Sequence, residues 1–319
     1  MSGGAIAATA AEQQDIRSHN SGGATESKGV GTSRWTPYVL LTPGFLWLML
    51  FFVIPTALLL LFSLYTGSLD QGYTFEFPGH WQTYSDALSQ YWPQFLRSFV
   101  FAGLSTIFCL ALAYPLAYFI AFRAGKWKAT LLVLVIAPFF TSFLIRTLAW
   151  KTILSDDGLV VSFMKWTHLL DLLAALHLTE TDRVLNTPLA VVLGLTYNFL
   201  PFMVLPLYAS LDRMDPRLVE AAQDLYSSPW TALRKVTWPL SLPGVVAGTL
   251  LTFIPAAGDY INAELLGTTK VSMIGNVIQD QFFVITDYPT ASALSFVLML
   301  AILILVFVYV RRAGTEELV

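Results

Sequence analysis

The sequence contains few charged residues, and this scarcity excludes most classes of soluble protein. Only 12% of the 319 residues are charged, whereas a typical soluble domain carries about 25%. The net charge of −3 and the pI of about 5.8 also argue against a nucleic-acid-binding protein, which needs a basic surface. In contrast, 55% of the residues are hydrophobic and the mean hydropathy is +0.63. The composition therefore indicates a protein that crosses a lipid bilayer several times.

Residues for catalytic or metal chemistry are equally scarce. The single cysteine, Cys109, excludes an internal disulfide and a zinc site built from several cysteines. The four histidines are scattered, without the close spacing of a metal-binding motif. The sequence lacks a phosphate-binding Gly-x-x-x-x-Gly-Lys-Ser/Thr loop and shows no grouped nucleophile, base and orienting residue. We therefore expect a non-catalytic chain that binds no metal and no cofactor.

Six stretches are long and apolar enough to cross a membrane as helices. A transmembrane helix needs about 20 mostly apolar residues, because each residue rises about 1.5 Å and the hydrocarbon layer is about 30 Å thick. The sequence therefore predicts an all-α, polytopic bundle of six transmembrane helices. Proline occurs inside several of them and predicts kinks. The predicted spans are Tyr38–Tyr65, Gln94–Phe122, Ala129–Leu154, Pro188–Leu211, Leu240–Leu266 and Pro289–Val310.

The polar segments define the remaining organisation of the chain. Residues 1–35 are small and polar and lack the apolar core of a signal peptide, so we expect a disordered cytoplasmic tail. Residues 36–312 form the predicted transmembrane domain, which includes a long loop at about 212–240. Residues 313–319 form a short C-terminal tail.

One further apolar stretch, Leu159–Leu178, competes as a seventh span. It contains Lys165, His168 and Asp171, and each charge at the centre of a bilayer costs about 2.5–3.5 kcal/mol on insertion scales. A seventh span would also move the basic residues that follow it to the outer side. We therefore expect this stretch to lie on the outer membrane surface as an amphipathic helix.

Lys and Arg are distributed unequally between the two sides of the predicted bundle. With six spans both termini lie on one side, which then carries twelve of these residues, while the other side carries five and Arg146 lies within a span. Positive residues are enriched on the cytoplasmic side of membrane proteins. We therefore expect both termini in the cytoplasm and the more acidic loops outside.

The predicted cytoplasmic loop at 212–240 carries the signals of two short helices. Asp215 is a suitable N-cap for a helix that begins at Pro216, and Ser228 followed by Pro229 repeats this signal. From this pattern alone, the loop is either an ordinary amphipathic hairpin with a solvated charged face or a surface to which another protein binds.

A segment of this loop resembles a known motif. Glu220-Ala221-Ala222, followed by Val236-Thr-Trp-Pro239, resembles the EAA loop of permease subunits in type I ABC importers. In that family the loop forms a coupling helix that binds the ATP-hydrolysing subunit. Tyr226 stands where the family usually has a glycine, which eases the bend. The resemblance implies an ATPase-coupling site made of Glu220, Ala221, Ala222, Asp224, Leu225 and Tyr226.

Other segments resemble polyamine permeases of the spermidine/putrescine type, and together they cover the chain from about Trp35 onward. They are Pro138–Arg146, Leu200–Tyr208, Phe253–Gly258, Glu264–Gly267, Met273–Phe282 and Asp287–Pro289. The resemblance implies the type I ABC importer permease fold and a place in the plasma membrane of a prokaryote. It also implies three partners: an ATP-binding subunit dimer that holds ATP and Mg, a second homologous permease that supplies the other half of the path, and an extracytoplasmic polyamine-binding protein.

Ionisable residues within the predicted spans mark candidate positions on the path of the cargo, because they are costly in lipid. Arg146 lies in the third span, and Asp259 and Glu264 lie near the outer end of the fifth. A polyamine is a chain of ammonium groups, which carboxylates and aromatic faces attract. The candidate substrate path consists of Asp259, Tyr260, Glu264, Trp150, Tyr197, Asn198, Phe253 and Asn262.

Two of these assignments have alternatives. Asp259 either contacts the cargo or forms a structural ion pair with Arg146, and Glu264 either contacts the cargo or is solvated at the edge of the membrane. Pro255 and Gly258 immediately precede Asp259 and predict a break in the fifth span. We expect Arg146, Pro255 and Gly258 to serve the structure or the gate.

Three rival functions are weaker. A self-contained secondary transporter would need inverted repeats and charges within several spans, and an intramembrane enzyme would need paired acids, Ser/His or metal ligands there. An importer of a metal, an oxyanion or an amino-acid-like cargo keeps the class and changes the substrate. The acidic outer loops and the carboxylates of the fifth span favour a cation.

Overall fold

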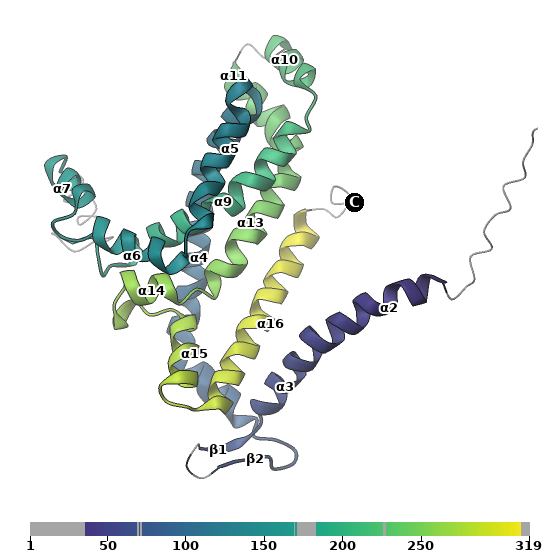
Figure 1. Cartoon of the computed structure of the whole chain (residues 1–319), viewed down its shortest axis with the longest axis vertical. Helices are drawn as coiled ribbons and strands as arrows, with labels where there is room; N and C mark the ends of the chain where they lie inside the picture. The colour runs from purple at the N-terminus through teal and green to yellow at the C-terminus, as the bar shows by residue number, and fades with distance from the viewer. Residues whose placement is uncertain are drawn as a thin grey trace, which may run out of the picture. The chain divides into compact units, whose positions relative to one another are not determined.

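The computed structural model describes residues 36–68, 70, 72–168, 170, 183–225 and 228–313. Over these residues the fold is almost entirely helical (Figure 1), which confirms the predicted helical membrane architecture. The chain divides into two units, residues 1–55 and 56–319. The predicted N-terminal tail at 1–35 lies outside the described residues, as do positions 314–319 of the predicted C-terminal tail.

The first unit contains a single apolar helical stretch. Helix α2 spans Thr36–Leu48 and continues through a π-helical turn, η1, at Met49–Val53. The next helix, α3 at Ile54–Phe62, begins in this unit and continues into the second. The π-turn ends two residues before Pro55, as expected near a proline that removes a backbone donor from the helix. The stretch Tyr38–Phe62 is long and apolar enough to cross a membrane.

Three helices, α4, α9 and α13, form the centre of the second unit and pack against one another (Figure 1). Their bounds are Gln82–Phe122, Pro188–Asp212 and Leu242–Ala257. The start of α9 follows from its sequence, because Thr187 accepts a hydrogen bond from the Ala190 amide at 3.4 Å and proline is favoured at the first helical position. Buried residues shared by the three helices include Cys109, Ala113, Ala117, Met203, Leu207 and Val245.

The third predicted span is bent into two helices. A 3-10 turn, η2 (Gly125–Trp127), leads into α5 (Lys128–Ile136), and a second turn, η3 (Ala137–Phe140), ends this arm. Helix α6 (Phe143–Ile153) then leaves at 95°. The bend follows from the extended backbone at Thr141, where φ is −92° and ψ is 152°. Proline inside this span predicted a kink, and Pro138 lies three residues before the corner, but the sequence did not predict an angle of 95°.

The fifth predicted span is also interrupted. Helix α10 (Pro216–Leu225) and α11 (Pro229–Ala232) precede a π-turn, η4 (Leu233–Thr237), and the short α12 (Trp238–Leu240). The segment Trp230–Leu240 then meets α13 at 68°. Helix α13 ends at Ala257, and α14 (Ile261–Leu266) begins after a connection that contains Gly258. The predicted break near Gly258 is therefore present.

Four described helices are long and apolar enough to cross a membrane, and up to six such segments result if each bent pair is one span. The four are Tyr38–Phe62, Gln82–Phe122, Pro188–Asp212 and Tyr288–Arg312. The segment that competed as a seventh span begins with α7 (Leu159–Trp166), whose eight residues are too short to span a bilayer. The rest of that segment, apart from positions 167, 168 and 170, lies outside the described residues.

The end of the second unit opposite α10 holds elements that the sequence did not predict. A 3-10 turn, η5 (Thr269–Val271), leads to α15 (Ile274–Phe283). The helix that follows, α16 (Tyr288–Ala313), corresponds to the sixth predicted span. Strands β1 (Thr66–Ser68) and β2 (Gly72–Thr74) form an antiparallel ribbon in which Thr66 pairs with Thr74. The Tyr73 hydroxyl donates to the Thr286 carbonyl. The ribbon is thus attached to the connection between α15 and α16.

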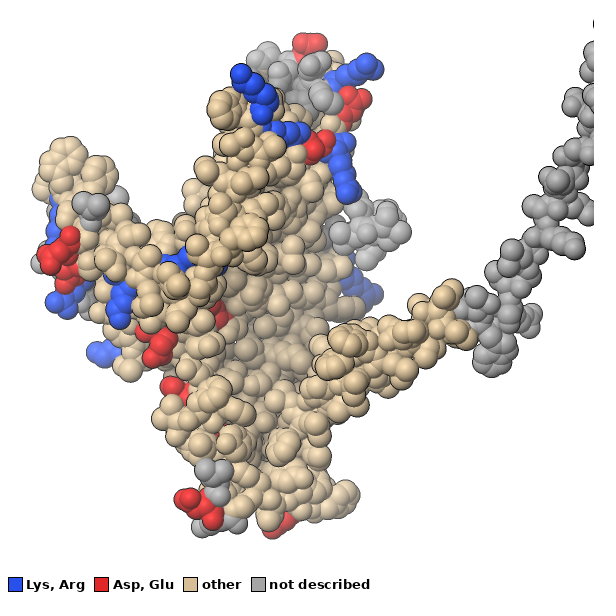
Figure 2. All heavy atoms as spheres, in the orientation of Figure 1, with Lys and Arg blue, Asp and Glu red and all other residues tan. Residues whose placement is uncertain are grey.

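Charged side chains gather at the two ends of this unit. On the face in Figure 2, Lys and Arg gather with acidic residues around α10 and α11, and acidic side chains lie near β1 and β2. Lys128 at the start of α5 forms an ion pair with Asp212 at the end of α9. Asp212 also accepts a hydrogen bond from the Tyr208 hydroxyl at 3.1 Å. These contacts place the start of the third predicted span beside the end of the fourth.

Candidate functional site

Helix α10 begins where the sequence predicts. The Asp215 carboxylate accepts a hydrogen bond from the Arg217 amide at 3.0 Å, and the helix starts at Pro216. The cap compensates one of the amide groups that a helix leaves unpaired at its N-terminus. Helix α11 likewise starts at Pro229, directly after Ser228. The predicted pair of short helices is therefore confirmed.

The expected coupling residues lie along α10. Glu220, Ala221, Ala222, Asp224 and Leu225 all belong to this helix, and the side chains of Ala221, Asp224 and Leu225 are exposed. The remaining expected residue, Tyr226, lies outside the described residues.

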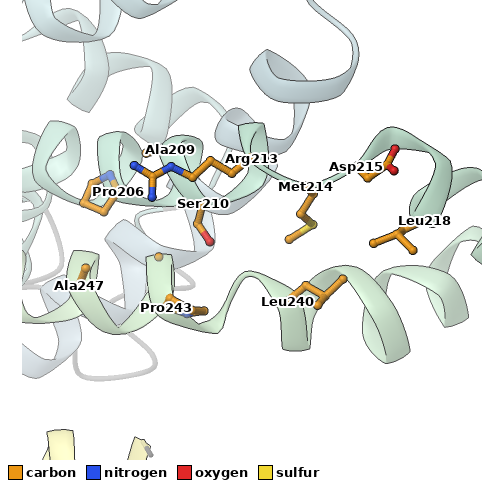
Figure 3. Close-up of a pocket in the computed structure, with 11 residues that line it drawn as sticks. Pro206, Ala209, Ser210, Arg213, Met214, Asp215, Leu218, Leu240, Pro243 and Ala247 are labelled. Atoms are coloured by element: carbon orange, nitrogen blue, oxygen red, sulfur yellow. The ribbon is translucent and has the colours of Figure 1, made fainter. Parts of the chain in front are cut away.

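Large apolar side chains are exposed on these two helices. Leu225 is 80% exposed, and Leu218 and Trp230 are also exposed. Such a group of apolar side chains on a polar loop is typical of a surface that another protein covers. A cavity of about 590 Å³ lies beside them, between the end of α9 and the start of α13 (Figure 3). The side chain of Arg213 lies along the α9 wall of this cavity.

A chain of buried hydrogen bonds connects the polar residues predicted for the path. The Asn198 side-chain amide donates to Thr147 Oγ1 of α6 at 3.2 Å and to Asn262 Oδ1 of α14 at 3.0 Å. Asn262 donates to Asp259 Oδ1 twice, from its side-chain amide at 3.1 Å and from its backbone amide at 2.8 Å. Three of the expected residues, Asn198, Asn262 and Asp259, are therefore brought together in one network.

Asp259 thus acts as a cap for α14, and it is 9% exposed. Among the described residues, no ion pair joins it to Arg146, although the sequence allowed one. The Arg146 guanidinium instead lies 5.9 Å from the ring centre of Phe139 and 5.6 Å from that of Phe143. Its Nε and Nη1 atoms have no hydrogen-bond partner among the described residues, and the residue is 8% exposed.

Glu264 is exposed to solvent, and its carboxylate also accepts a hydrogen bond from a neighbouring helix. Asn276 of α15 donates its side-chain amide to Glu264 Oε2 at 3.1 Å and to the Tyr260 carbonyl at 3.0 Å. The Tyr260 side chain is exposed. The carboxylate at position 264 is therefore both accessible and bonded to a neighbouring helix, which neither of the two sequence-based alternatives included.

The predicted aromatic residues fall into two groups. The rings of Trp150 and Tyr197 lie 5.3 Å apart and connect α6 to α9. Phe253 is buried in α13 and stacks on Phe99 of α4 at 6.1 Å. Pro255 lies inside α13, two residues before its end. Trp150 and Tyr197 therefore form a pair, whereas Phe253 packs within the core of this chain.

Sequence reasoning missed four residues around this site. Thr147, Asn276 and Phe139 contact the expected residues from segments that are distant in the chain or separated from them by the corner at Thr141. Phe143 is a local contact, because it lies three residues before Arg146 in α6. The position of Asn276 was also a local signal, since it accepts a hydrogen bond from the Met273 amide at 3.0 Å and so caps α15.

Comparison with known sequences finds transport permeases among the relatives of this chain. No protein-family model matches the chain. The spermidine/putrescine transport system permease protein PotB of Haemophilus influenzae is 37% identical over 268 residues, which cover 84% of this chain and 90% of that protein. PotB of Escherichia coli K12 is 39% identical over 223 residues (70% and 78%). The inner membrane ABC transporter permease protein YdcU of the same strain is 34% identical over 227 residues (70% and 72%).

Solved structures confirm the fold. A chain of a bacterial ABC transporter involved in the import of the acidic polysaccharide alginate has a TM-score of 0.65 and 18% identity, and the match covers 89% of this chain and 96% of that one. A second structure of an alginate ABC transporter, in complex with a periplasmic protein bound to an alginate pentasaccharide, also has a TM-score of 0.65. Together, the sequence and fold comparisons show that the chain is a multi-pass membrane protein of the family of spermidine/putrescine transport system permeases.

Proposed function

We propose that this chain is the non-catalytic permease subunit of an ATP-driven polyamine importer and forms half of the path for spermidine or putrescine. The observation that carries the proposal is the 37% identity to the PotB permease of Haemophilus influenzae over 84% of this chain. The alternatives of a metal, oxyanion or amino-acid-like cargo, or of a secondary transporter, have no comparable support.

The proposed energy source is an ATP-binding subunit dimer that docks on α10 and α11. ATP and Mg would be held by that partner, and this chain would bind no cofactor. The exposed side chains of Leu225 and Trp230 support the docking site, because apolar surface of this kind is buried in protein interfaces. The proposed coupling residues are Glu220, Ala221, Ala222, Asp224, Leu225 and Tyr226.

The proposed cargo path runs past the corner between α13 and α14. Carboxylates attract ammonium groups, and aromatic faces add cation–π contacts of about 0.5–2 kcal/mol each. The accessible carboxylate of Glu264 and the Trp150–Tyr197 ring pair are suited to a flexible polycation. The proposed path residues are Asp259, Tyr260, Glu264, Trp150, Tyr197, Asn198, Phe253 and Asn262, of which Asn198 and Asn262 act through their contacts with Asp259.

The proposed gate uses the breaks in the helices. Gly258 lies at the end of α13, Pro255 lies within its last turn, and Arg146 lies in α6 beyond the 95° corner. Helix ends of this kind are able to move relative to one another while each helix stays intact. Arg146 has the charge of the cargo, so we assign it to the gate or to the structure.

The proposed orientation places α10, α11 and both termini in the cytoplasm of a prokaryotic cell. The gathering of Lys and Arg around α10 and α11 supports it, because basic residues are enriched on that side (Figure 2). The opposite end, with β1, β2 and α15, would then meet an extracytoplasmic polyamine-binding protein. A second homologous permease would complete the path within the bilayer.

The test is ATP-dependent uptake of radiolabelled spermidine by vesicles that contain the complete complex and its binding protein. We expect Asp259→Asn to lower the transport rate about tenfold, which corresponds to about 1.4 kcal/mol. The amount of assembled complex should stay unchanged. The matched control is Asp280→Asn, which removes an exposed carboxylate of α15.

Two results would contradict the proposal. If the complete complex hydrolyses ATP but moves no polyamine, the proposal that polyamines are the cargo is wrong. If uptake by Asp259→Asn falls only in proportion to the amount of assembled complex, Asp259 has a structural role and does not contact the cargo.

A further inference from the structure

The two carboxylates at the α13–α14 corner are each held by an asparagine. Asn262 holds Asp259 through two hydrogen bonds of 2.8 and 3.1 Å, and Asn276 holds Glu264 at 3.1 Å. Neither asparagine lies free to meet a passing solute, since Asn262 is 0% exposed and Asn276 is 3% exposed. Their side chains therefore act on the carboxylates and not on the cargo.

An amide donor and a basic side chain have different effects on a carboxylate that binds cations. A Lys or Arg in the same place would neutralise the carboxylate and remove its attraction for an ammonium group. An amide is uncharged, so it fixes the direction of the carboxylate and leaves its negative charge in place. The arrangement thus fixes the direction of both carboxylates without placing a positive charge beside them.

Close packing holds the corner on two sides. A Cβ atom added to Gly194 of α9 would lie 2.7 Å from Asn262 Oδ1, so only glycine leaves room for this amide. A Cβ atom added to Gly275 of α15 would lie 2.7 Å from the Gly258 carbonyl oxygen and 3.0 Å from that of Asp259. Atoms in such contact cannot shift independently, so the corner moves only together with the parts of α9 and α15 that pack against it.

Helix α15, which carries Asn276, is itself attached to the long helix α4. Arg97 Nη1 donates to the Ser272 carbonyl at 2.8 Å, and the Ile274 amide donates to Ser98 Oγ at 2.7 Å. These bonds position the start of α15 relative to the central helices. The geometry of Glu264 is therefore set by contacts that reach into the centre of the second unit.

We propose that Asn262 and Asn276 are positioning residues that set the direction and separation of the Asp259 and Glu264 carboxylates, and that this separation determines which cation is transported fastest. The inference rests on the proposed function. A triamine such as spermidine carries more ammonium groups than the diamine putrescine, and it spans a greater distance. A fixed pair of carboxylates discriminates between the two, whereas a mobile pair adapts to both.

The test compares the transport rates of spermidine and putrescine by the complete complex in vesicles. Asn276→Ser shortens the side chain so that it no longer reaches Glu264, and it introduces no charge. We expect the rate for spermidine to fall about tenfold, as for the loss of a hydrogen bond to a charged group. The rate for putrescine should fall less, so that the spermidine-to-putrescine ratio changes. A purely structural defect would lower both rates equally, because it only reduces the amount of active complex.

A double-mutant cycle shows whether Asn276 acts through Glu264. In a Glu264→Gln background, Asn276→Ser should change the ratio by less than about twofold, because residues that act through one contact are not additive. If Asn276→Ser prevents assembly, Asn276→Thr takes its place, since its side chain is also too short to reach Glu264 and likewise introduces no charge.

Three outcomes overturn the inference. An unchanged ratio in Asn276→Ser, with a changed ratio in Glu264→Gln, refutes the positioning role and leaves the proposed path intact. Independent, multiplicative effects of the two substitutions refute the action of Asn276 through Glu264. If Glu264→Gln and Asp259→Asn both leave the transport of either cargo unchanged, the proposed path fails together with the inference.

Discussion

The α10–α11 loop and the α13–α14 corner differ in the kind of side chain that they expose and the kind that they bury. The loop exposes large apolar side chains such as Leu225 and Trp230, whereas the corner buries polar side chains such as Asn198 and Asn262. Exposed apolar surface is stabilised when a partner covers it, and buried polar groups are stabilised only by hydrogen bonds that are already present. The difference supports the proposal that another protein covers the loop. At the corner the polar side chains bond to one another within this chain, although Asn198 Oδ1 has no hydrogen-bond partner among the described residues.

The largest effect should come from charging the loop. Leu225→Asp places a carboxylate where we expect the ATPase partner to bury an apolar side chain, so association should weaken at least about tenfold. The thermal stability of the isolated permease should stay the same, because Leu225 is 80% exposed. Co-purification of the ATPase with the permease measures the effect.

The matched control for this prediction is Leu225→Met, which keeps the apolar surface and should preserve association. If Leu225→Asp binds the ATPase as well as the unmodified chain does, the loop is an ordinary solvated hairpin. The exposed apolar side chains of the loop would then not indicate a partner, and the difference between the two regions would have no bearing on function.

A smaller effect should follow from adding one methyl group at the corner. In Gly194→Ala the new carbon would lie 2.7 Å from Asn262 Oδ1 and still closer to Cδ1 of Leu266, so α9 and α14 must separate or both side chains must turn away. Overpacking of this kind costs about 1–3 kcal/mol. Thermal unfolding of the purified protein in detergent should show a lower midpoint.

Gly103→Ala is the control, because a Cβ atom at this position in α4 has nothing within 4 Å. Alanine is favoured over glycine inside a helix, so this variant should be unchanged or slightly more stable. Equal destabilisation of the two variants would show that the corner is not packed more tightly than the rest of the chain.

The smallest effect concerns the start of α10. Asp215→Ala removes the hydrogen bond to the Arg217 amide and should cost about 1 kcal/mol. Because the loop is held by local contacts, the loss should appear as faster hydrogen exchange of the first amides of α10. The unfolding midpoint of the whole protein should not change.

Asp224→Ala in the same helix serves as the control, since Asp224 is exposed and does not cap the helix. A lower unfolding midpoint of the whole protein in Asp215→Ala than in Asp224→Ala would mean that α10 is coupled to the core. The loop would then be held, like the corner, by contacts between helices that are distant in the chain.

Local features of both regions were predictable from the sequence. Proline after Asp215 and after Ser228 predicted the starts of α10 and α11, because a cap and a missing amide act within a few residues. Gly258 predicted the end of α13 for the same reason. Asp259, Asn198 and Asn262 were recognised as candidates because polar residues are costly in apolar segments.

The contacts between these candidates were not predictable. Asn198 and Asn262 are 64 positions apart, and only the packing of α14 on α9 makes them neighbours. The 95° corner before α6 and the ribbon of β1 and β2 lay equally beyond the sequence, because apolar composition specifies neither the direction of a helix nor short strand pairing. Arg146 lies over Phe139 and Phe143 and, among the described residues, forms no ion pair with Asp259.

Composition and short-range chemistry thus determined that this protein is a helical membrane protein with a capped loop between the fourth and fifth predicted spans and a break in the fifth. Hydropathy and helix capping depend on neighbours along the chain, so the sequence is sufficient for them. Tertiary structure alone decided which polar residues meet, that Asn276 holds Glu264, and that Asp259 is bonded to Asn262. Hydrogen bonds and close contacts depend on distances between helices, and these distances exist only once α9, α13, α14 and α15 have packed.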